Sequence, residues 1–393
     1  MARTATVGTA LRTFPRECFR GFIGSFPGFN RALRICAICA VTWAGAGCSA
    51  GYILRAGWEE ARILTNRRPI QAVLRDTTVD ALTRDKLRLV LDVRDFAVRD
   101  LGLRAGNSYR DFTELDRDTL ALQVMAAAEL DLTWKMWNFP IVGALPYKAW
   151  FDFDRALAEA EALRREGWDV RVSPVSAFST LGWFPDPILS PTLRADSVSL
   201  ANTVIHEILH STYYPTGQAD FNESFANFVG YRGAIAFFCD AVRSRPPAAS
   251  SDPAEATSPA CATARQRWED ARIFGRFFQS VAEPLRAVYD SGAPDPEKRI
   301  EKRQVFADAA ARWEAEYREA LGGRFGSIDP GQLNNAWVIA RLLYYRGLDD
   351  FETVYARHGE LMPAVREITE TAEGRDPWEA LQSLLAPDES EAR

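Results

Sequence analysis

The chain has 393 residues, of which 47% are hydrophobic and 25% are charged, so it is long enough to bury a sizeable core without help from disulfides. Its formal net charge of −6 and its pI near 5.4 give it no overall positive potential with which to bind nucleic acid. Composition therefore indicates a globular protein and argues against a nucleic-acid partner.

The N-terminal segment has the features of an export signal. Arg31 and Arg34 precede a short apolar run over residues 35–48, which ends in small residues, as in a secretory signal. The run is well below the roughly 20 residues needed to span a bilayer. Small residues ending at Cys48 resemble a bacterial lipoprotein cleavage site, which implies removal of residues 1–47 and a lipid on Cys48. The alternatives are a soluble secreted protein and a cytosolic protein with an unusual N-terminus.

Downstream of this signal, the spacing of apolar residues predicts a mainly helical chain. The predicted helices cover residues 52–70, 83–102, 154–167, 197–213, 221–239, 263–290, 295–321, 331–346 and 349–371. Between the second and third of them, residues 139–152 are apolar but contain two prolines and a glycine. These residues exclude a regular helix there.

One segment alternates like a β-strand. Residues 169–180 have this pattern, and Pro174 places the strand at the edge of a sheet because proline cannot donate to a central ladder. No repeat or clean linker interrupts residues 50–385. We therefore expect a single domain over residues 48–385, followed by a disordered tail over residues 386–393. The predicted fold class is α+β, mainly α, with a small sheet and a large helical part.

Two of the three histidines of the chain, His206 and His210, lie four residues apart, and Glu207 directly follows the first. Residues i and i+4 share one helix face, so both imidazoles can reach one metal ion. This H-E-x-x-H arrangement predicts one Zn²⁺ per chain, with Glu207 as general base for the attacking water. The alternative is an ordinary helix with two hydrogen-bonded histidines and a solvated glutamate.

A catalytic zinc site needs a third protein ligand. Glu223 is the candidate, because Pro215 and Gly217 turn the chain and let the next helix return beside the first. A second interpretation is open, since Asp220 and Glu223 have the spacing of a capping box at a helix start. The remaining histidine, His358, is close to a predicted helix end and is expected at the surface.

The stretch HEILH followed by FNESFANF resembles zincin metallopeptidases whose third ligand is a Glu in an N-E-x-F-A segment, although the 12 residues between His210 and Glu223 make a shorter spacing. Further segments, among them GCSAGYILRAG, FPIVGALPYKAWFD, VSAFSTLGWFPDPILS and LNNAWVIARLLYYRG, are similar to a bacterial family of predicted aminopeptidases, often lipoproteins. The resemblance implies a zincin-like fold, zinc held by His206, His210 and Glu223, and Glu207 as the catalytic base.

Other side chains can complete such a site. Hydrolysis needs a donor for the developing oxyanion, and reliable metal ligands need hydrogen-bond partners. The candidates for the oxyanion are Tyr344, Tyr345, Tyr213 and Tyr214, and those for orienting the ligands are Asn222 and Asn227. For each of them, packing in the core is the alternative. The predicted edge strand before the metal helix can pair with an extended peptide substrate, or serve as a structural strand alone.

The cysteines fit an exported protein. After removal of residues 1–47, only Cys239 and Cys261 remain besides Cys48, and they flank a Pro/Ala/Ser-rich segment typical of a surface loop. A disulfide that closes this loop suits an oxidising compartment. Two unrelated thiols are the alternative.

Together these patterns predict a zinc-dependent peptidase of the bacterial cell envelope, exported and anchored by lipid facing the periplasm, with peptides as substrates. An aminopeptidase is the preferred interpretation. The alternatives are an envelope endopeptidase and a non-catalytic envelope scaffold whose zinc is structural. Structural zinc is closed by four ligands, commonly including Cys, and only Cys239 lies near the motif. The sequence gives no information about the oligomeric state.

Overall fold

The computed structural model describes residues 50–139, 143–175, 185–240, 258–326 and 328–386. Contacts divide the chain into two units, Met1–Ile53 and Leu54–Arg393, and the hydrophobic core belongs to the second. The predicted export signal, Cys48 and residues 387–393 of the predicted tail lie outside the described residues.

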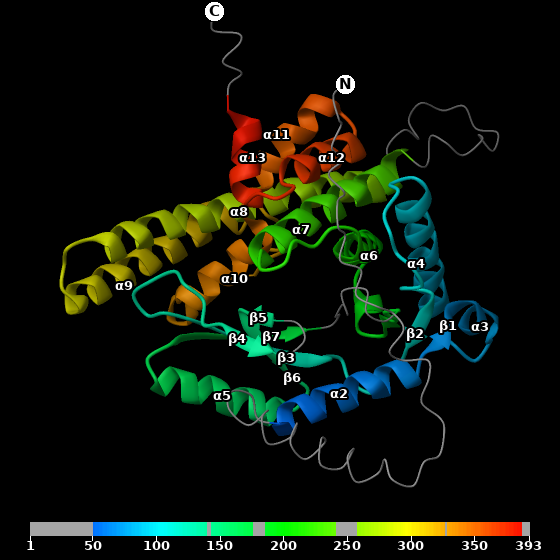
Figure 1. The fold of residues 1–393 in the computed structure, drawn as a ribbon, viewed down its shortest axis with the longest axis horizontal. Helices are drawn as coiled ribbons and strands as arrows, with labels where there is room; N and C mark the ends of the chain where they lie inside the picture. Colours follow the sequence, from blue (N-terminus) through cyan, green and yellow to red (C-terminus); the bar gives the residue numbers. More distant parts are fainter. Residues whose placement is uncertain (1–49, 140–142, 176–184, 241–257, 327, 387–393) are drawn as a thin grey trace, which may run out of the picture. The chain divides into compact units, whose positions relative to one another are not determined.

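The fold is α+β and mainly α (Figure 1). Its α-helices are α2 (Ala50–Thr65), α3 (Ile70–Arg75), α4 (Ala81–Arg99), α5 (Phe153–Arg165), α6 (Ser197–Thr212), α7 (Ala219–Ile235), α8 (Pro259–Asp290), α9 (Asp295–Arg312), α10 (Asn335–Tyr345), α11 (Leu348–His358), α12 (Leu361–Thr371) and α13 (Pro377–Leu385). Short 3-10 or π turns cover Thr192–Arg194, Ala236–Asp240, Trp313–Tyr317 and Pro330–Gln332. Within the described ranges, no helix is long and apolar enough to span a bilayer.

Short strands form small sheets. The strands are β1 (Arg68–Pro69), β2 (Asp111–Thr113), β3 (Ala121–Ala127), β4 (Trp137–Phe139), β5 (Gly143–Leu145), β6 (Tyr147–Trp150), β7 (Asp169–Val175) and β8 (Ile188–Leu189). In Figure 1 the strands β3, β6 and β7 lie between α10 and α5. Their orders are β1-β2-β8, β6-β3-β7 and β4-β5, and only the β2–β8 pair is parallel. Strand β7, which contains Pro174, is at the edge of its sheet, as predicted.

The antiparallel sheet β6-β3-β7 has two different faces. On one face, small and β-branched side chains such as Val124 and Val170 pack with Ala156 and Ala160 of α5. On the other face, Met125 clusters with residues of α10. Side chains alternate along a strand, and residues opposite each other in neighbouring strands share a face. Residues opposite Met125, which are Tyr147 of β6 and Arg171 of β7, therefore share the α10 face, whereas the α5 face is lined by small and β-branched side chains.

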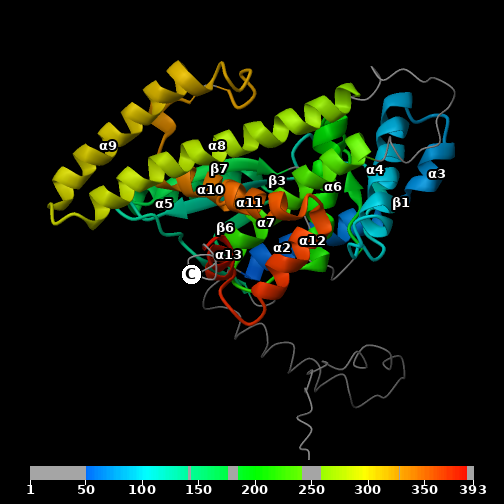
Figure 2. The ribbon, with the colours of Figure 1, turned by 90° about the horizontal axis from the view of Figure 1, so that it is seen from above.

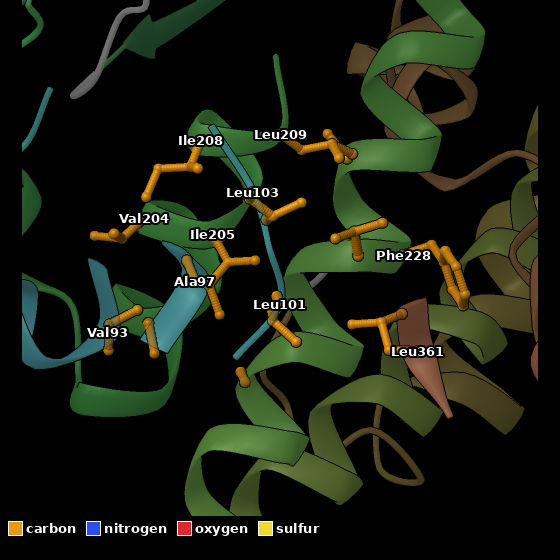
Figure 3. Close-up of a cluster of buried hydrophobic side chains, with 14 of the residues drawn as sticks. Val93, Ala97, Leu101, Leu103, Val204, Ile205, Ile208, Leu209, Phe228 and Leu361 are labelled. Carbon is orange, nitrogen blue, oxygen red and sulfur yellow. The ribbon is translucent and has the colours of Figure 1, made fainter. Parts of the chain in front are cut away.

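Helix α6 lies in the middle of the core, and its own buried residues occupy most of its circumference. The Asp196 carboxylate begins it by accepting from the backbone N–H groups of Val198 and Ser199. Figure 3 shows the Val204 and Ile208 side chains on one side of α6 and Leu209 on the side toward Phe228 of α7, with Ile205 between them.

Two glycines let α7 approach α6 closely. A Cβ atom on Gly230 would lie 2.9 Å from the Asn202 carbonyl oxygen, and one on Gly233 would lie 2.9 Å from the Ile205 Cδ1 atom. Neither position tolerates a larger residue without a shift of the helix backbone or of a buried side chain. This close packing holds the side chains of α7 beside the histidines of α6.

Helices α8, α11 and α12 pack against α7, and α8 also packs against α10. The helices α8 and α9 lie side by side, joined by a short turn, in both views (Figures 1 and 2). Cys239 and Cys261, the pair singled out in the sequence, form a disulfide with Cα atoms 4.9 Å apart. The disulfide fixes the start of α8 to the end of the α7 segment.

Several predicted elements have different boundaries. The single helix predicted over residues 349–371 is wrong: α11 ends at His358, because Gly359 has a φ of 69° and caps it in the left-handed conformation. The helix predicted from residue 331 begins at Asn335, where the Asn334 side chain accepts from the Trp337 N–H. Strand β3 and helix α13 were not predicted. In the described part of the predicted strand 169–180, β7 ends at Val175.

Candidate metal site

Three donor atoms from α6 and α7 converge on one point. His206 Nε2 is 3.2 Å from His210 Nε2 and 3.3 Å from Glu223 Oε2, and His210 Nε2 is 3.7 Å from Glu223 Oε2. Ligand atoms at about 2.0–2.1 Å from a tetrahedral zinc ion lie about 3.3–3.4 Å from one another. The three side chains could therefore hold one metal ion, and their spacing and chemistry fit zinc.

Local sequence explains this convergence. The two histidines face the same way because they are one helical turn apart on α6. After α6, Pro215 and Gly217, which has a φ of 82°, reverse the chain. Asn222 stabilises the turn, because its Nδ2 donates to the Pro215 carbonyl oxygen at 2.9 Å. Helix α7 therefore returns along α6 and presents Glu223 to the histidines.

Glu223 has no role in capping α7, so the capping-box interpretation is wrong. The helix begins at Ala219, with Gln218 at the N-cap position and no side-chain capping bond. Asp220 lies inside the first turn, where its carboxylate accepts from Arg346 at 2.7 Å and from the Trp378 indole at 2.9 Å. An Asp at this position neutralises partial positive charge at the helix start.

Asn227 fixes which nitrogen of His206 carries a proton. Its Nδ2 donates to the Tyr344 carbonyl oxygen at 2.6 Å, so its Oδ1 faces His206 Nδ1 at 3.2 Å. An amide oxygen can only accept, so Nδ1 carries the hydrogen and Nε2 of the neutral ring presents a lone pair. This lone pair faces the Glu223 carboxylate, which is also an acceptor. Either a proton or a metal ion must separate the two.

Charge and burial oppose each other at these ligands. Burial raises the pKa of the Glu223 carboxyl, but the nearby histidines lower it more strongly, so the pKa lies well below its usual range. Burial lowers the pKa of His210, whereas Glu223 and then Glu207 raise it, and the net shift is upward. His210 Nδ1 is buried without a hydrogen-bond partner among the described residues. The ionised carboxylate makes this centre suited to a cation.

Glu207 lies beside the three donors without belonging to their cluster. Its side chain is partly exposed, and its charge adds to the effect of burial in raising the pKa of the buried Tyr109 hydroxyl. The same charge contributes to raising the pKa of His210. The Glu207 carboxylate therefore acts electrostatically on both Tyr109 and His210.

Two of the candidate tyrosines are at the site. The Tyr344 ring stacks on His206 with centroids 6.5 Å apart, and the Tyr214 ring meets His210 edge-on at 5.6 Å. Burial raises the pKa of both hydroxyls, and the charge of Glu223 raises it further. Both hydroxyls therefore stay protonated at neutral pH and can donate hydrogen bonds.

Other candidates lie elsewhere or act indirectly. The Tyr345 ring packs 5.0 Å from that of Phe274 on α8, and no contact joins it to the three donors among the described residues. Tyr213 packs among the phenylalanines of α7, and Asn222 holds the turn rather than a ligand. His358 is exposed and 2.7 Å from Glu367, which confirms that it is a surface residue.

Sequence reasoning missed Tyr109, whose hydroxyl the charge of Glu207 reaches. Tyr109 is buried, and its φ of 61° is the one positive value of a non-glycine residue in the described ranges. Its N–H donates to the Asp186 carbonyl oxygen at 2.7 Å. A positive φ at a non-glycine residue is a backbone strain that is concentrated at functional sites. No local sequence pattern predicts it.

Comparison with known proteins gives one result. The model of a family described as "Putative aminopeptidase" matches residues 51–379, a range that includes α6, α7 and α10. No curated protein and no solved structure matches the chain.

Proposed function

This chain belongs to the family described as putative aminopeptidases, and from that premise we propose that it is a zinc-dependent aminopeptidase of the bacterial cell envelope. The observation that carries the proposal is the spacing of the donor atoms of His206, His210 and Glu223, which lie 3.2 to 3.7 Å apart. This spacing is the one that a single tetrahedral zinc ion requires.

Each side chain has a role in peptide hydrolysis. A zinc ion held by the three donors would supply Lewis-acid activation of water and of the peptide carbonyl. Glu207 would take a proton from the attacking water and deliver it to the leaving amine. Tyr344 and Tyr214, which keep their protons, are the donors available to a developing oxyanion. Asn227 keeps the Nε2 lone pair of His206 directed at the metal position.

Strand β7 supports an extended peptide as substrate. In the sheet order β6-β3-β7, the described residues pair only one side of β7 with another strand. A peptide added to the other side would gain backbone hydrogen bonds. Since β7 also contacts α10, which bears Tyr344, a peptide on this edge would run close to the donors.

The test combines metal analysis with a substrate panel. Purified protein should contain one equivalent of zinc and should release the N-terminal residue from peptides with a free amine. Peptides with an acetylated N-terminus should be cleaved at least about tenfold more slowly. Equal cleavage of both would indicate an endopeptidase, and bound zinc with no turnover would indicate a scaffold. Glu207→Gln is the control for a contaminating peptidase, because it should retain zinc and lose activity.

The proposed location depends on residues before the described part of the chain. We propose export, cleavage before Cys48 and lipid attachment to its thiol, because the basic flank, the short apolar run and the small residues before Cys48 form that pattern. Mass spectrometry of the membrane fraction should find a lipidated N-terminal Cys48 peptide. A peptide from residues 1–47 in the mature protein would contradict the proposal.

A further inference from the structure

Two arginines beside the candidate metal site lack an acidic partner. Arg171 is on β7 and Arg341 is on α10, and the described residues place no carboxylate near enough to pair with either guanidinium. Arg341 Nε is buried and has no hydrogen-bond partner in the described part of the chain. The segment 176–184, which follows β7, contains no Asp or Glu.

The register of the sheet directs Arg171 toward α10. Arg171 lies opposite Met125 of β3, and Met125 lies opposite Tyr147 of β6 on its other side. Residues opposite one another in antiparallel strands share a face. Met125 packs with Leu343 and Tyr344 of α10, so Arg171 is on the face that looks toward the metal site rather than toward α5.

Two aromatic rings pack against Arg341 on α10. Its guanidinium carbon lies 5.8 Å from the centroid of Phe274 and 5.5 Å from that of Trp337. Tyr344 follows one helical turn later, and its ring stacks on His206. Helix α10 therefore carries both Arg341 and a side chain that contacts the donor cluster.

Electrostatic effects link Arg171 to both Tyr344 and Arg341. Burial and then the charge of Glu223 raise the pKa of the Tyr344 hydroxyl, and the positive charge of Arg171 lowers it. Burial and then the charge of Arg341 lower the pKa of Arg171 to about 10. These effects agree with the sheet register, which turns Arg171 toward α10.

Burying the Arg171 and Arg341 guanidinium groups near each other without a negative partner costs free energy, because both lose hydration and repel each other. Elsewhere the fold gives a buried cation its partner: Lys302, for example, is 2.7 Å from the Asp169 carboxylate, which is on the same strand as Arg171. A guanidinium presents a planar fork of N–H donors that matches a carboxylate. A ligand that brings a carboxylate would compensate both arginines.

We propose that Arg171 and Arg341 form a binding subsite for a carboxylate of the peptide substrate. This rests on the proposed peptidase function and assigns its substrate class: short peptides that carry an anionic group close to the scissile bond. The carboxylate has two possible sources, which are the C-terminus of a di- or tripeptide and an Asp or Glu side chain.

Three substrates separate these sources: Ala-Ala, its C-terminal amide Ala-Ala-NH₂, and Ala-Asp-NH₂. With wild-type protein, kcat/KM for Ala-Ala should exceed that for Ala-Ala-NH₂ at least about tenfold if the C-terminus is bound. A preference for Ala-Asp-NH₂ over Ala-Ala-NH₂ would assign the side chain instead. Arg171→Met and Arg341→Met should each reduce the preference to near unity. Arg312→Met is the matched control, because Arg312 also lies over a ring, that of Phe277, and it should leave the preference unchanged.

Binding separates the failure of this inference from failure of the proposed function. Equilibrium binding of the same three peptides is measured with Glu207→Gln, which hydrolyses them slowly. Tighter binding of the carboxylate peptides that depends on Arg171 would support the subsite even if wild-type protein hydrolyses none of them. Equal binding and equal turnover of all three would overturn the inference and leave the peptidase intact. If Arg171→Met fails to fold, Arg171→Lys and Arg341→Met decide, since Lys keeps the charge but loses the fork.

Discussion

Replacing Asn227 with Ala tests the orientation of His206, a proposed metal ligand, without removing that ligand. The amide bonds His206 Nδ1 at 3.2 Å and the Tyr344 carbonyl oxygen at 2.6 Å. Alanine makes neither bond, so the imidazole of His206 can rotate or place its proton on Nε2. Either change removes the lone pair from the metal position.

The magnitude follows from the two broken bonds. Losing the partner of a metal-binding histidine typically weakens metal affinity by about 10- to 100-fold, or about 1.4–2.7 kcal/mol. The free energy of unfolding of the metal-free protein should also fall, because two buried polar groups lose a partner at about 1–3 kcal/mol each. Since Tyr344 loses its tie to α7, turnover should fall more than zinc occupancy.

The assay is competition for zinc against a chelator of known affinity, together with urea unfolding of the metal-free protein. Asn335→Ala is the matched control, because Asn335 is also a buried asparagine but its Nδ2 donates to the Ala128 carbonyl oxygen at 2.9 Å instead of contacting a ligand. The control should lose stability and keep its zinc affinity within about threefold. Equal zinc affinities for Asn227→Ala, Asn335→Ala and the wild type would refute the orientation argument.

Three further outcomes follow from the geometry. Glu207→Gln should keep zinc and lower turnover about 10²-fold or more, whereas His206→Ala should lose most zinc; metal content and kcat measured on the same samples distinguish them. Glu223→Gln should lose zinc while circular dichroism stays native, since Glu223 caps no helix; full zinc occupancy would remove it from the ligand set. Reducing the Cys239–Cys261 disulfide, which spans 22 residues, should lower the free energy of unfolding by about 3 kcal/mol, and an unchanged urea midpoint would contradict this.

Helices were predictable where their signals are local. The apolar spacing of α6 and its Asp196 cap lie within one stretch of chain, and so do the prolines that exclude a helix over residues 139–152. Strand β3 was missed because its residues 124–127 are all apolar and buried on both faces, so no alternation is visible. The break at Gly359 was missed because glycine is tolerated inside helical patterns, and only its positive φ reveals a cap.

The candidate site divides in the same way. His206 and His210 owe their common direction to helical geometry, which four residues of sequence specify. Glu223 needed one more step, a turn that Pro215 and Gly217 mark. Tyr344 and Arg171 come from elements far along the chain, and their approach to the donors depends on packing of α10 between the sheet and α7. No short pattern contains that information.

At the C-terminal end of α10, an α7 side chain that stabilises the fold also orients His206. The last four carbonyls of a helix have no partner within it. In α10, Ser224 donates to the Leu343 carbonyl at 3.1 Å and Asn227 donates to that of Tyr344, so α7 supplies two of the missing donors.

Because Asn227 also accepts from His206, the docking of α10 and the tautomer of a metal ligand depend on one amide. Only a side chain with both a donor and an acceptor at this reach can do both. Asn227→Asp would keep the acceptor for His206 but set a carboxylate against the Tyr344 carbonyl. It should therefore retain zinc better than Asn227→Ala while destabilising the fold at least as much. Weaker zinc binding by Asn227→Asp than by Asn227→Ala, measured in the same chelator competition, would show that the two roles are not joined in this amide.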